Sequence, residues 1–271
     1  MSTSSNSHVD VMSQIAESLK LWRYWTLRAW LVFSRKRRTS KLGYLWEPIS
    51  FLVVTLSLSL VWSIIFRRKT FTDFFPYFCA GYFVWSLMSK FAKQGTRFFR
   101  KSSGDMRNSA RSPITYLCEM FCEALIPAAV NLPVVLVVLI VFGDYLGPLG
   151  IIQFLYAIVL IVITGFGFCL LFGKICFLTP DLEEVFASLL RISFLLTPVI
   201  WSVDRLREYK PLIWLNPFYG YLHIGREGLL SRDVEWLAYP VTLGITTVIL
   251  IAGVWLYSRS YTTIRRRSFM Q

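Results

Sequence analysis

Six apolar stretches alternate with short polar segments along the chain, and each is long enough to form a helix that crosses a bilayer. The stretches are expected at about 49–66, 74–91, 117–142, 149–172, 182–201 and 236–257. A transmembrane helix requires about 20 predominantly apolar residues. The pattern therefore predicts an all-α integral membrane protein with six transmembrane helices.

The segment between the fifth and sixth stretches is too apolar for an ordinary loop and too interrupted to span a bilayer. The fifth helix is expected to end at Thr197-Pro198, and Asn216-Pro217 interrupts the apolar run that follows. Where a helix is interrupted at membrane depth, its free backbone N–H and C=O groups must form hydrogen bonds with other parts of the protein or with water in a cavity. We therefore expect a re-entrant pair of short helices over about 202–230, on the outer, periplasmic side.

The two ends of the chain are polar. A Ser-rich tail at 1–14, without a signal peptide, is expected to be disordered. From 15 to 33 the charges recur about every turn among apolar residues, which is typical of an amphipathic helix in the cytoplasmic membrane interface. This helix and a basic linker occupy 15–45, the transmembrane domain occupies 46–258, and a basic cytoplasmic tail follows at 259–271.

The composition excludes an ordinary soluble domain, because 55% of the residues are hydrophobic and only 17% are charged. The net charge of +13 is better explained by the positive-inside rule and by anionic lipids than by nucleic acid, since the basic residues lie beside the apolar stretches. With six spans, twenty of the 29 lysines and arginines fall on the side of the termini and eight on the other. Both termini are therefore expected in the cytoplasm, with membrane lipids and no nucleic acid as partners.

The sequence lacks motifs that would let this chain perform chemistry by itself. It contains no G-x-x-x-x-G-K-[ST] loop for ATP, no His/Cys/Asp cluster for a metal, and no candidate Ser-His-Asp triad. The five cysteines lie in or beside apolar stretches and are expected to be small buried side chains. We therefore expect no enzyme activity, no cofactor bound by this chain, and a pore-forming subunit driven by a separate protein.

Three of the charged residues inside the predicted spans are candidates for a functional role. Glu119 and Glu123 lie one turn apart on one face of the third span, and Arg191 lies near the middle of the fifth. Such residues rarely face lipid and are functional candidates. Pairing of Arg191 with Glu119, Glu123 or Glu184 is the favoured arrangement, and a membrane enzyme or secondary transporter that uses the three charges is the alternative.

Several short motifs resemble those of one transporter family. Thr197 to Trp201 (Thr-Pro-Val-Ile-Trp), Leu215-Asn216-Pro217 and Arg226-Glu227 look like the C-terminal half of type-2 ABC exporter permeases. The Leu-Gly-Tyr-Leu-Trp run from Leu42 to Trp46, after a basic cluster, is similar to the start of the first span in the branch that exports O-antigen, capsular polysaccharide and teichoic acid. The resemblance covers nearly the whole chain, and it depends on the order and spacing of these motifs together.

The resemblance implies a homodimer that pairs with two ATP-binding cassette subunits, which would hold the ATP and Mg²⁺. A lipid-linked polysaccharide, O-antigen before capsule, would cross a bacterial inner membrane between the two copies. In this family the region at 93–116 carries the helix that docks into the ATPase, and Asp181 matches half of an Arg-Asp pair at the next cytoplasmic connection. The candidate coupling residues are Arg97, Arg100, Lys101, Asp105, Arg107, Asn108, Arg111 and Asp181.

Aromatic side chains are candidates for the transport path, since sugar rings stack their C–H faces on aromatic rings. Most of the aromatics are expected in interface belts and the core, so only a minority is assigned to the channel: Tyr77, Tyr82, Trp85, Trp201 and Tyr219. The candidate gate residues of the re-entrant region are Pro198, Asn216, Pro217, Arg226 and Glu227. A permease for a small lipid or drug remains an alternative.

Overall fold

The computed structural model describes residues 11–38, 41–65, 70–108, 111–142 and 147–259, and within them it contains helices and no strands. The helices are α1 (Val11–Lys20), α2 (Trp22–Arg38), η1 (Gly43–Leu45), α3 (Trp46–Ile65), α4 (Phe71–Asn108), α5 (Pro113–Val141), α6 (Pro148–Leu178), α7 (Leu182–Leu196), η2 (Val203–Leu215), α8 (Tyr219–Leu229) and α9 (Ala238–Ser258). The predicted all-α class is confirmed for this part of the chain.

Four helices in the described ranges are long and apolar enough to cross a membrane: Gly43–Ile65, Pro113–Val141, Pro148–Leu178 and Ala238–Ser258. They correspond to four of the six predicted spans. The helix α4 has 38 residues, but its tyrosines, tryptophan and charged residues make it less apolar than these four helices. The helix α7 has only 15 residues, fewer than the ~20 that a span requires. The protein is therefore helical and suited to a membrane, with four candidate spans.

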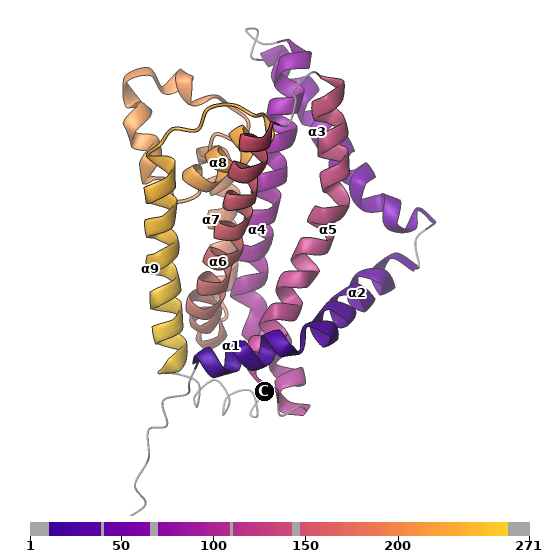
Figure 1. Cartoon of the computed structure of the whole chain (residues 1–271), viewed down its shortest axis with the longest axis vertical. Coiled ribbons are helices and arrows are strands. Elements are labelled where there is room, and N and C mark those ends of the chain that lie inside the picture. Colours follow the sequence, from indigo (N-terminus) through magenta and orange to yellow (C-terminus); the bar gives the residue numbers. More distant parts are fainter. Residues whose placement is uncertain (1–10, 39–40, 66–69, 109–110, 143–146, 260–271) are drawn as a thin grey trace, which may run out of the picture.

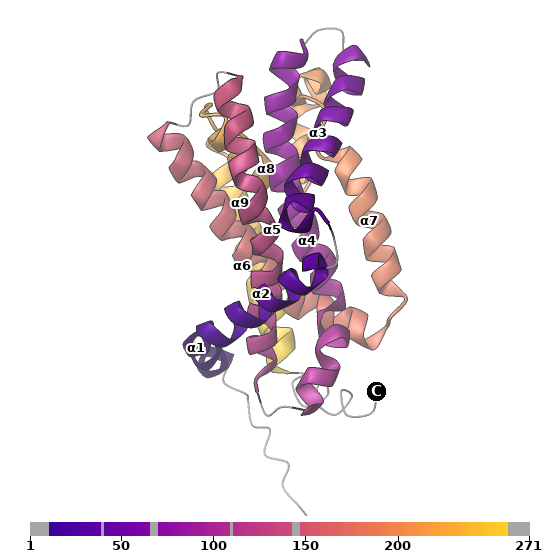
Figure 2. The same ribbon diagram turned by 90° about the vertical axis from the view of Figure 1, so that its right-hand side faces the viewer.

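The long helices run side by side, and most of the short elements lie toward the two ends of this bundle, whereas α7 runs along its side (Figure 1). Helices α1 and α2 cross the lower part of the bundle in that view, near the end of α9, whereas η2 and α8 lie in the upper part. We call these the α1 end and the α8 end. Figure 2 shows α7 at the edge of the bundle, where its apolar side chains, including Leu189, Ile192 and Leu195, are exposed.

The prediction that the N-terminal tail is disordered is wrong for residues 11–14, because α1 begins at Val11. Residues 1–10 lie outside the described ranges. Val11 is buried, and Gln14 Oε1 accepts hydrogen bonds from Ser112 Oγ (2.7 Å) and Tyr257 Oη (3.0 Å). The expected amphipathic helix is thus two helices, α1 and α2, that meet at Leu21. Tertiary contacts to α5 and α9 order a segment whose composition alone predicts disorder.

The polar interruption predicted at 93–116 is mostly helix. The helix α4 continues to Asn108, and the next helix begins at Pro113 after Ser112, whose side chain accepts a hydrogen bond from the Ile114 amide. No proline interrupts 93–108, and the charged side chains in this extension form ion pairs with neighbouring helices. The predicted connections at 66–69 and 143–146, and the basic tail beyond Arg259, lie outside the described residues.

Glycines allow α6 to approach three other helices at backbone distance. A Cβ atom added at Gly253 would lie 2.4 Å from the Gly167 carbonyl oxygen, so neither position has room for a side chain. The three close pairs are Gly150 with Gly228 of α8, Gly167 with Gly253 of α9, and Gly173 with Gly95 of α4. Small residues permit this close helix packing where lipid replaces water.

The helix α8 is enclosed by the bundle. Every residue from Tyr219 to Leu229 is buried, and the helix packs against α4, α6 and α9. The preceding η2 is mostly exposed and bends at Arg207, whose φ is 47°. The two elements form the pair of short helices expected between the fifth and sixth stretches.

Replacing Gly253 by alanine is expected to destabilise the protein by about 1–3 kcal/mol, because the new methyl group overlaps the backbone of α6. Gly244→Ala is the matched control on the same helix, since no atom lies within 4 Å of the added Cβ. Thermal unfolding in detergent, followed by circular dichroism, measures both. An unchanged midpoint for Gly253→Ala would contradict the close α6–α9 contact.

Candidate functional site

A groove of about 630 Å³ opens between α3, α4 and α7. Its residues come from three helices, so its shape depends on how α7 is held against α4. The lining residues are Val54 and Leu58 of α3, Tyr82, Trp85, Ser86, Ser89, Lys90 and Lys93 of α4, and Leu190, Arg191, Phe194 and Leu195 of α7. We refer to this cavity as the lateral groove.

The lateral groove has an aromatic part and a basic part. The ring of Phe194 lies 5.7 Å from that of Trp85 and 6.4 Å from that of Tyr82. Lys90, Lys93 and Arg191 line the part nearer the α1 end, and the lining includes no carboxylate. The groove can therefore combine ring stacking with attraction of an anionic group.

The predicted pairing of Arg191 is wrong. Its guanidinium donates to Ser188 Oγ at 2.9 Å, and no carboxylate of the described residues forms an ion pair with it. Each of the three proposed partners has a different cation: Arg28 for Glu119, Lys101 for Glu123 and Arg97 for Glu184. Helix α7 packs against α4, and Arg191 lines both the lateral groove and a neighbouring cavity that Glu183 and Glu184 also line.

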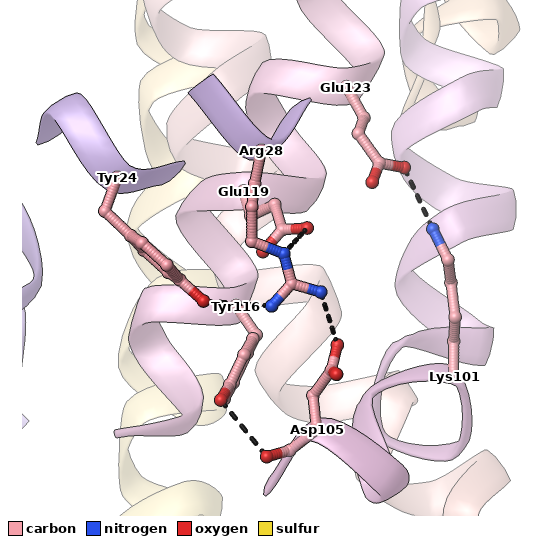
Figure 3. Close-up of polar contacts among 7 residues, drawn as sticks. All are labelled: Tyr24, Arg28, Lys101, Asp105, Tyr116, Glu119 and Glu123. Atoms are coloured by element: carbon pink, nitrogen blue, oxygen red, sulfur yellow. Dashed lines mark hydrogen bonds and ion pairs between the residues drawn. The ribbon is translucent and has the colours of Figure 1, made fainter. Parts of the chain in front are cut away.

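Arg28 of α2 joins three helices at the α1 end (Figure 3). Its Nη2 lies 2.8 Å from Asp105 Oδ2 of α4, and its Nε lies 3.1 Å from Glu119 Oε1 of α5. Its Nη1 also donates to Tyr24 Oη at 2.9 Å. Partial burial alone would lower the pKa of Arg28, but the bonds to Tyr24 and Asp105 and the charges of Glu119 and Asp105 raise it. Arg28 is therefore a permanent cation that ties α2 to the bundle.

Two further contacts extend this cluster. Lys101 Nζ lies 2.9 Å from Glu123 Oε2, and Tyr116 Oη donates to the Asp105 carbonyl at 3.2 Å (Figure 3). Glu119 and Glu123 are therefore matched to separate cations from other helices. This arrangement accounts for both carboxylates as ion pairs between helices, without an acid and base that face each other across a cleft.

A second ion-pair cluster holds α7 against α4. Glu183, whose side chain is 3% exposed, pairs with Arg100 and lies 3.4 Å from Arg97 Nε; Arg97 also lies 3.8 Å from Glu184. Sequence reasoning missed Glu183, although an acidic residue in the first turn of a helix is a recognisable signal. This cluster sets the width of the lateral groove at the α1 end.

The six candidate coupling residues whose side chains the structure describes divide into two groups. Arg97, Arg100, Lys101 and Asp105 are engaged in ion pairs within the chain. Arg111 and Asp181 are exposed at the α1 end, and the Arg111 guanidinium lies 4.0 Å from the centre of the Tyr24 ring. Positions 107 and 108 belong to α4, but the side chains of Arg107 and Asn108 are outside what the structure describes.

Most of the candidate gate residues form a buried network at the α8 end. Arg226, which is 2% exposed, donates to the Pro198 carbonyl at 2.7 Å and lies 2.9 Å from Glu227 Oε1. Asn216 Nδ2 donates to Thr197 Oγ1 at 2.9 Å. The segment after α7 is thereby joined to α8.

The other candidates lie elsewhere. Pro217 is exposed and borders a separate apolar cavity. Tyr82 and Trp85 line the lateral groove, whereas Tyr77 and Tyr219 line a polar cavity at the α8 end. Trp201 accepts a hydrogen bond from Tyr77 Oη on its carbonyl (3.3 Å), and its Nε1 donates to the Leu195 carbonyl (3.0 Å). Two of the five aromatic candidates therefore line the lateral groove, two line the polar cavity, and Trp201 is hydrogen-bonded to Tyr77 and to the last turn of α7.

Neither a scan against protein-family models nor a search of curated proteins returned a match for this chain. The family relationship therefore remains a prediction from the sequence motifs.

Replacing Arg28 by alanine is expected to destabilise the protein by about 1–3 kcal/mol, because the Glu119 carboxylate, 8% exposed, loses its cation. Arg23→Ala is the matched control, since Arg23 lies on the same helix and is exposed. Thermal unfolding in detergent measures both variants.

Adding Glu119→Gln to Arg28→Ala removes the orphaned charge and is expected to restore part of the lost stability. If Arg28→Ala unfolds at the same temperature as Arg23→Ala, the ion pair makes no contribution and the cluster does not anchor α2.

Proposed function

We propose that this chain is the transmembrane permease subunit of an ATP-driven ABC exporter that carries a lipid-linked polysaccharide across a bacterial inner membrane. O-antigen is the favoured polymer, followed by capsular polysaccharide. The observation that carries the proposal is the lateral groove, which combines aromatic rings with three basic residues and no carboxylate.

The chemistry of the lateral groove suits this substrate class. Tyr82, Trp85 and Phe194 offer ring faces and edges against which sugars can pack, and Lys90, Lys93 and Arg191 attract the phosphate of a lipid carrier. The groove of one chain would enclose the transport path on one side only. A homodimer, in which two grooves face each other between exposed apolar faces of α3 and α7, provides a closed path.

The proposed topology has six spans, with α4 and α7 as the second and fifth. The aromatic first half of α4 is largely buried in the bundle, including Phe78, Phe83 and Trp85, so its low hydropathy does not prevent it from crossing. Helix α8 is enclosed by protein, which is the condition for a re-entrant helix at membrane depth. Both termini then lie in the cytoplasm and the α8 end lies outside.

The energy source in this proposal is a pair of ATP-binding cassette subunits that hold ATP and Mg²⁺. Arg111 and Asp181 are exposed at the α1 end and are the proposed docking contacts. Arg97 and Arg100 are proposed to transmit movement from these contacts, because their ion pairs with Glu183 hold α7 to the extension of α4. Movement of the docked subunit would therefore be transmitted to α4 and α7, which both line the lateral groove.

Affinity purification of the tagged chain from native membranes is expected to recover a P-loop subunit at equal stoichiometry, with ATPase activity. The double variant Arg111→Glu/Asp181→Arg is expected to lower that activity at least about tenfold, because like charges at a docking surface cost several kcal/mol. Arg205→Glu/Glu208→Arg is the matched control, with the same charge changes in exposed residues of η2.

Recovery of the chain alone and without ATPase activity would contradict the proposal. A membrane enzyme or secondary transporter that uses Glu119, Glu123 and Arg191 would then be favoured. An ATPase partner without a carbohydrate-binding extension, together with export of a small lipid or drug, would favour the other alternative.

Tyr82→Ala and Lys93→Ala are expected to reduce export of polysaccharide to the cell surface several-fold while the dimer still assembles. The first loses a ring from the lateral groove and the second loses a positive charge. Tyr209→Ala and Lys20→Ala are matched controls, since both residues are exposed and neither lines the groove. Quantitative immunoblotting of surface polysaccharide measures export, and unchanged export in both groove variants would exclude the groove as the path.

A further inference from the structure

A second, smaller cavity of about 200 Å³ lies at the α8 end, among α4, η2, α8 and the segment that follows α8. We call it the α8-end cavity. Two hydrogen bonds link residues of the two cavities: Leu195, which lines the lateral groove, accepts one from Trp201, and the Trp201 carbonyl accepts one from Tyr77. Tyr77 lines the α8-end cavity.

One wall of the α8-end cavity is rigid and polar. Arg226 is held by the Pro198 carbonyl and by Glu227, and its guanidinium lies 4.1 Å from the centre of the Tyr77 ring. Arg226 and Glu227 are both buried. Their orientation is therefore set before any ligand arrives, which lowers the entropy cost of binding.

His223 presents a buried donor at this cavity. The side chain is 8% exposed, and its Nε2 accepts a hydrogen bond from the Glu235 amide at 3.2 Å. A ring nitrogen that accepts carries no proton, so the proton of the neutral imidazole lies on Nδ1. Nδ1 has no hydrogen-bond partner among the described residues, because Glu227 Oε1, at 3.8 Å, is too distant.

The charges around the α8-end cavity are balanced. Three basic and three acidic residues line it: Lys210, Arg226, Arg232, Asp204, Glu227 and Glu235. A free anion or cation would meet three charges of its own sign there. A neutral ligand with several hydroxyl groups finds both donors and acceptors, including the Nδ1–H of His223.

The volume restricts the ligand to a small one. At about 200 Å³, the cavity is below the ~300 Å³ at which pockets for drug-sized ligands begin. We propose that the α8-end cavity binds one neutral sugar unit, with His223 Nδ1–H, Glu235 and Arg226 as hydrogen-bonding groups. That this sugar belongs to an exported polymer rests on the proposed function, whereas the chemistry of the cavity does not.

Saturation-transfer-difference NMR on the purified full chain in lipid nanodiscs tests the proposal. The probes are the methyl glycosides of glucose, galactose, mannose, rhamnose and N-acetylglucosamine, with inorganic phosphate as a competitor. Transfer to at least one glycoside is expected, with no competition by phosphate. Absence of transfer to all five, or displacement of the sugar by phosphate, would overturn the assignment.

Two variants locate the binding site. His223→Gln retains an oxygen that can accept from the Glu235 amide but removes the Nδ1–H donor, and Glu235→Gln removes a carboxylate from an exposed residue. Each is expected to weaken binding about tenfold, which corresponds to one good hydrogen bond. Glu208→Gln, on the exposed surface of η2 and outside the cavity lining, is the matched control and is expected to bind normally.

Because Glu235 is exposed, its variant remains informative even if His223→Gln does not fold. Unchanged affinity in Glu235→Gln would overturn the assignment. ATPase co-purification separates the two proposals: ATPase activity without sugar binding overturns the cavity assignment alone, and sugar binding without an ATPase partner supports the cavity and overturns the exporter.

Discussion

The backbone contact between α6 and three neighbouring helices is the constraint on which the rest of the structure depends. In a lipid environment, helices associate through close van der Waals packing rather than through exclusion of water. The pairs that Gly150, Gly167 and Gly173 form with glycines of α8, α9 and α4 bring these helices to distances that a single methyl group would prevent. Helices α4 and α8, which carry most of the candidate site residues, are positioned by two of these contacts.

The two ends of the bundle are stabilised by different kinds of polar contact. At the α1 end, half-exposed cations meet buried carboxylates: Arg28 with Glu119 and Arg100 with Glu183. At the α8 end, the buried Arg226 contacts a carbonyl, a carboxylate and an aromatic ring. The cations of the first kind remain in contact with water, whereas the second kind is buried on both sides.

The lateral groove depends on both ends. Glu183 draws the start of α7 to α4, and the Trp201 bond to the Leu195 carbonyl holds the segment after α7 against its last turn. Between these points α7 stands at the edge of the bundle, with apolar side chains that no other described element covers. A short helix held at its two ends thus forms one wall of the lateral groove.

Apolar length and charge spacing in the sequence determined the helical class, the positions of the four candidate spans and the presence of two short helices before α9. Motif spacing also selected Pro198, Asn216, Arg226 and Glu227, which the fold brings into one network. The prediction of disorder was wrong for residues 11–14, because hydrogen bonds to distant helices offset the polar composition of this segment. The continuation of α4 through 93–108 is stabilised by ion pairs with other helices. Only the tertiary structure decided which charges meet. Periodicity along one helix shows which face is apolar but not which other helix lies against it, so the partners of Glu119, Glu183 and Arg191 could not be assigned before the helices were packed.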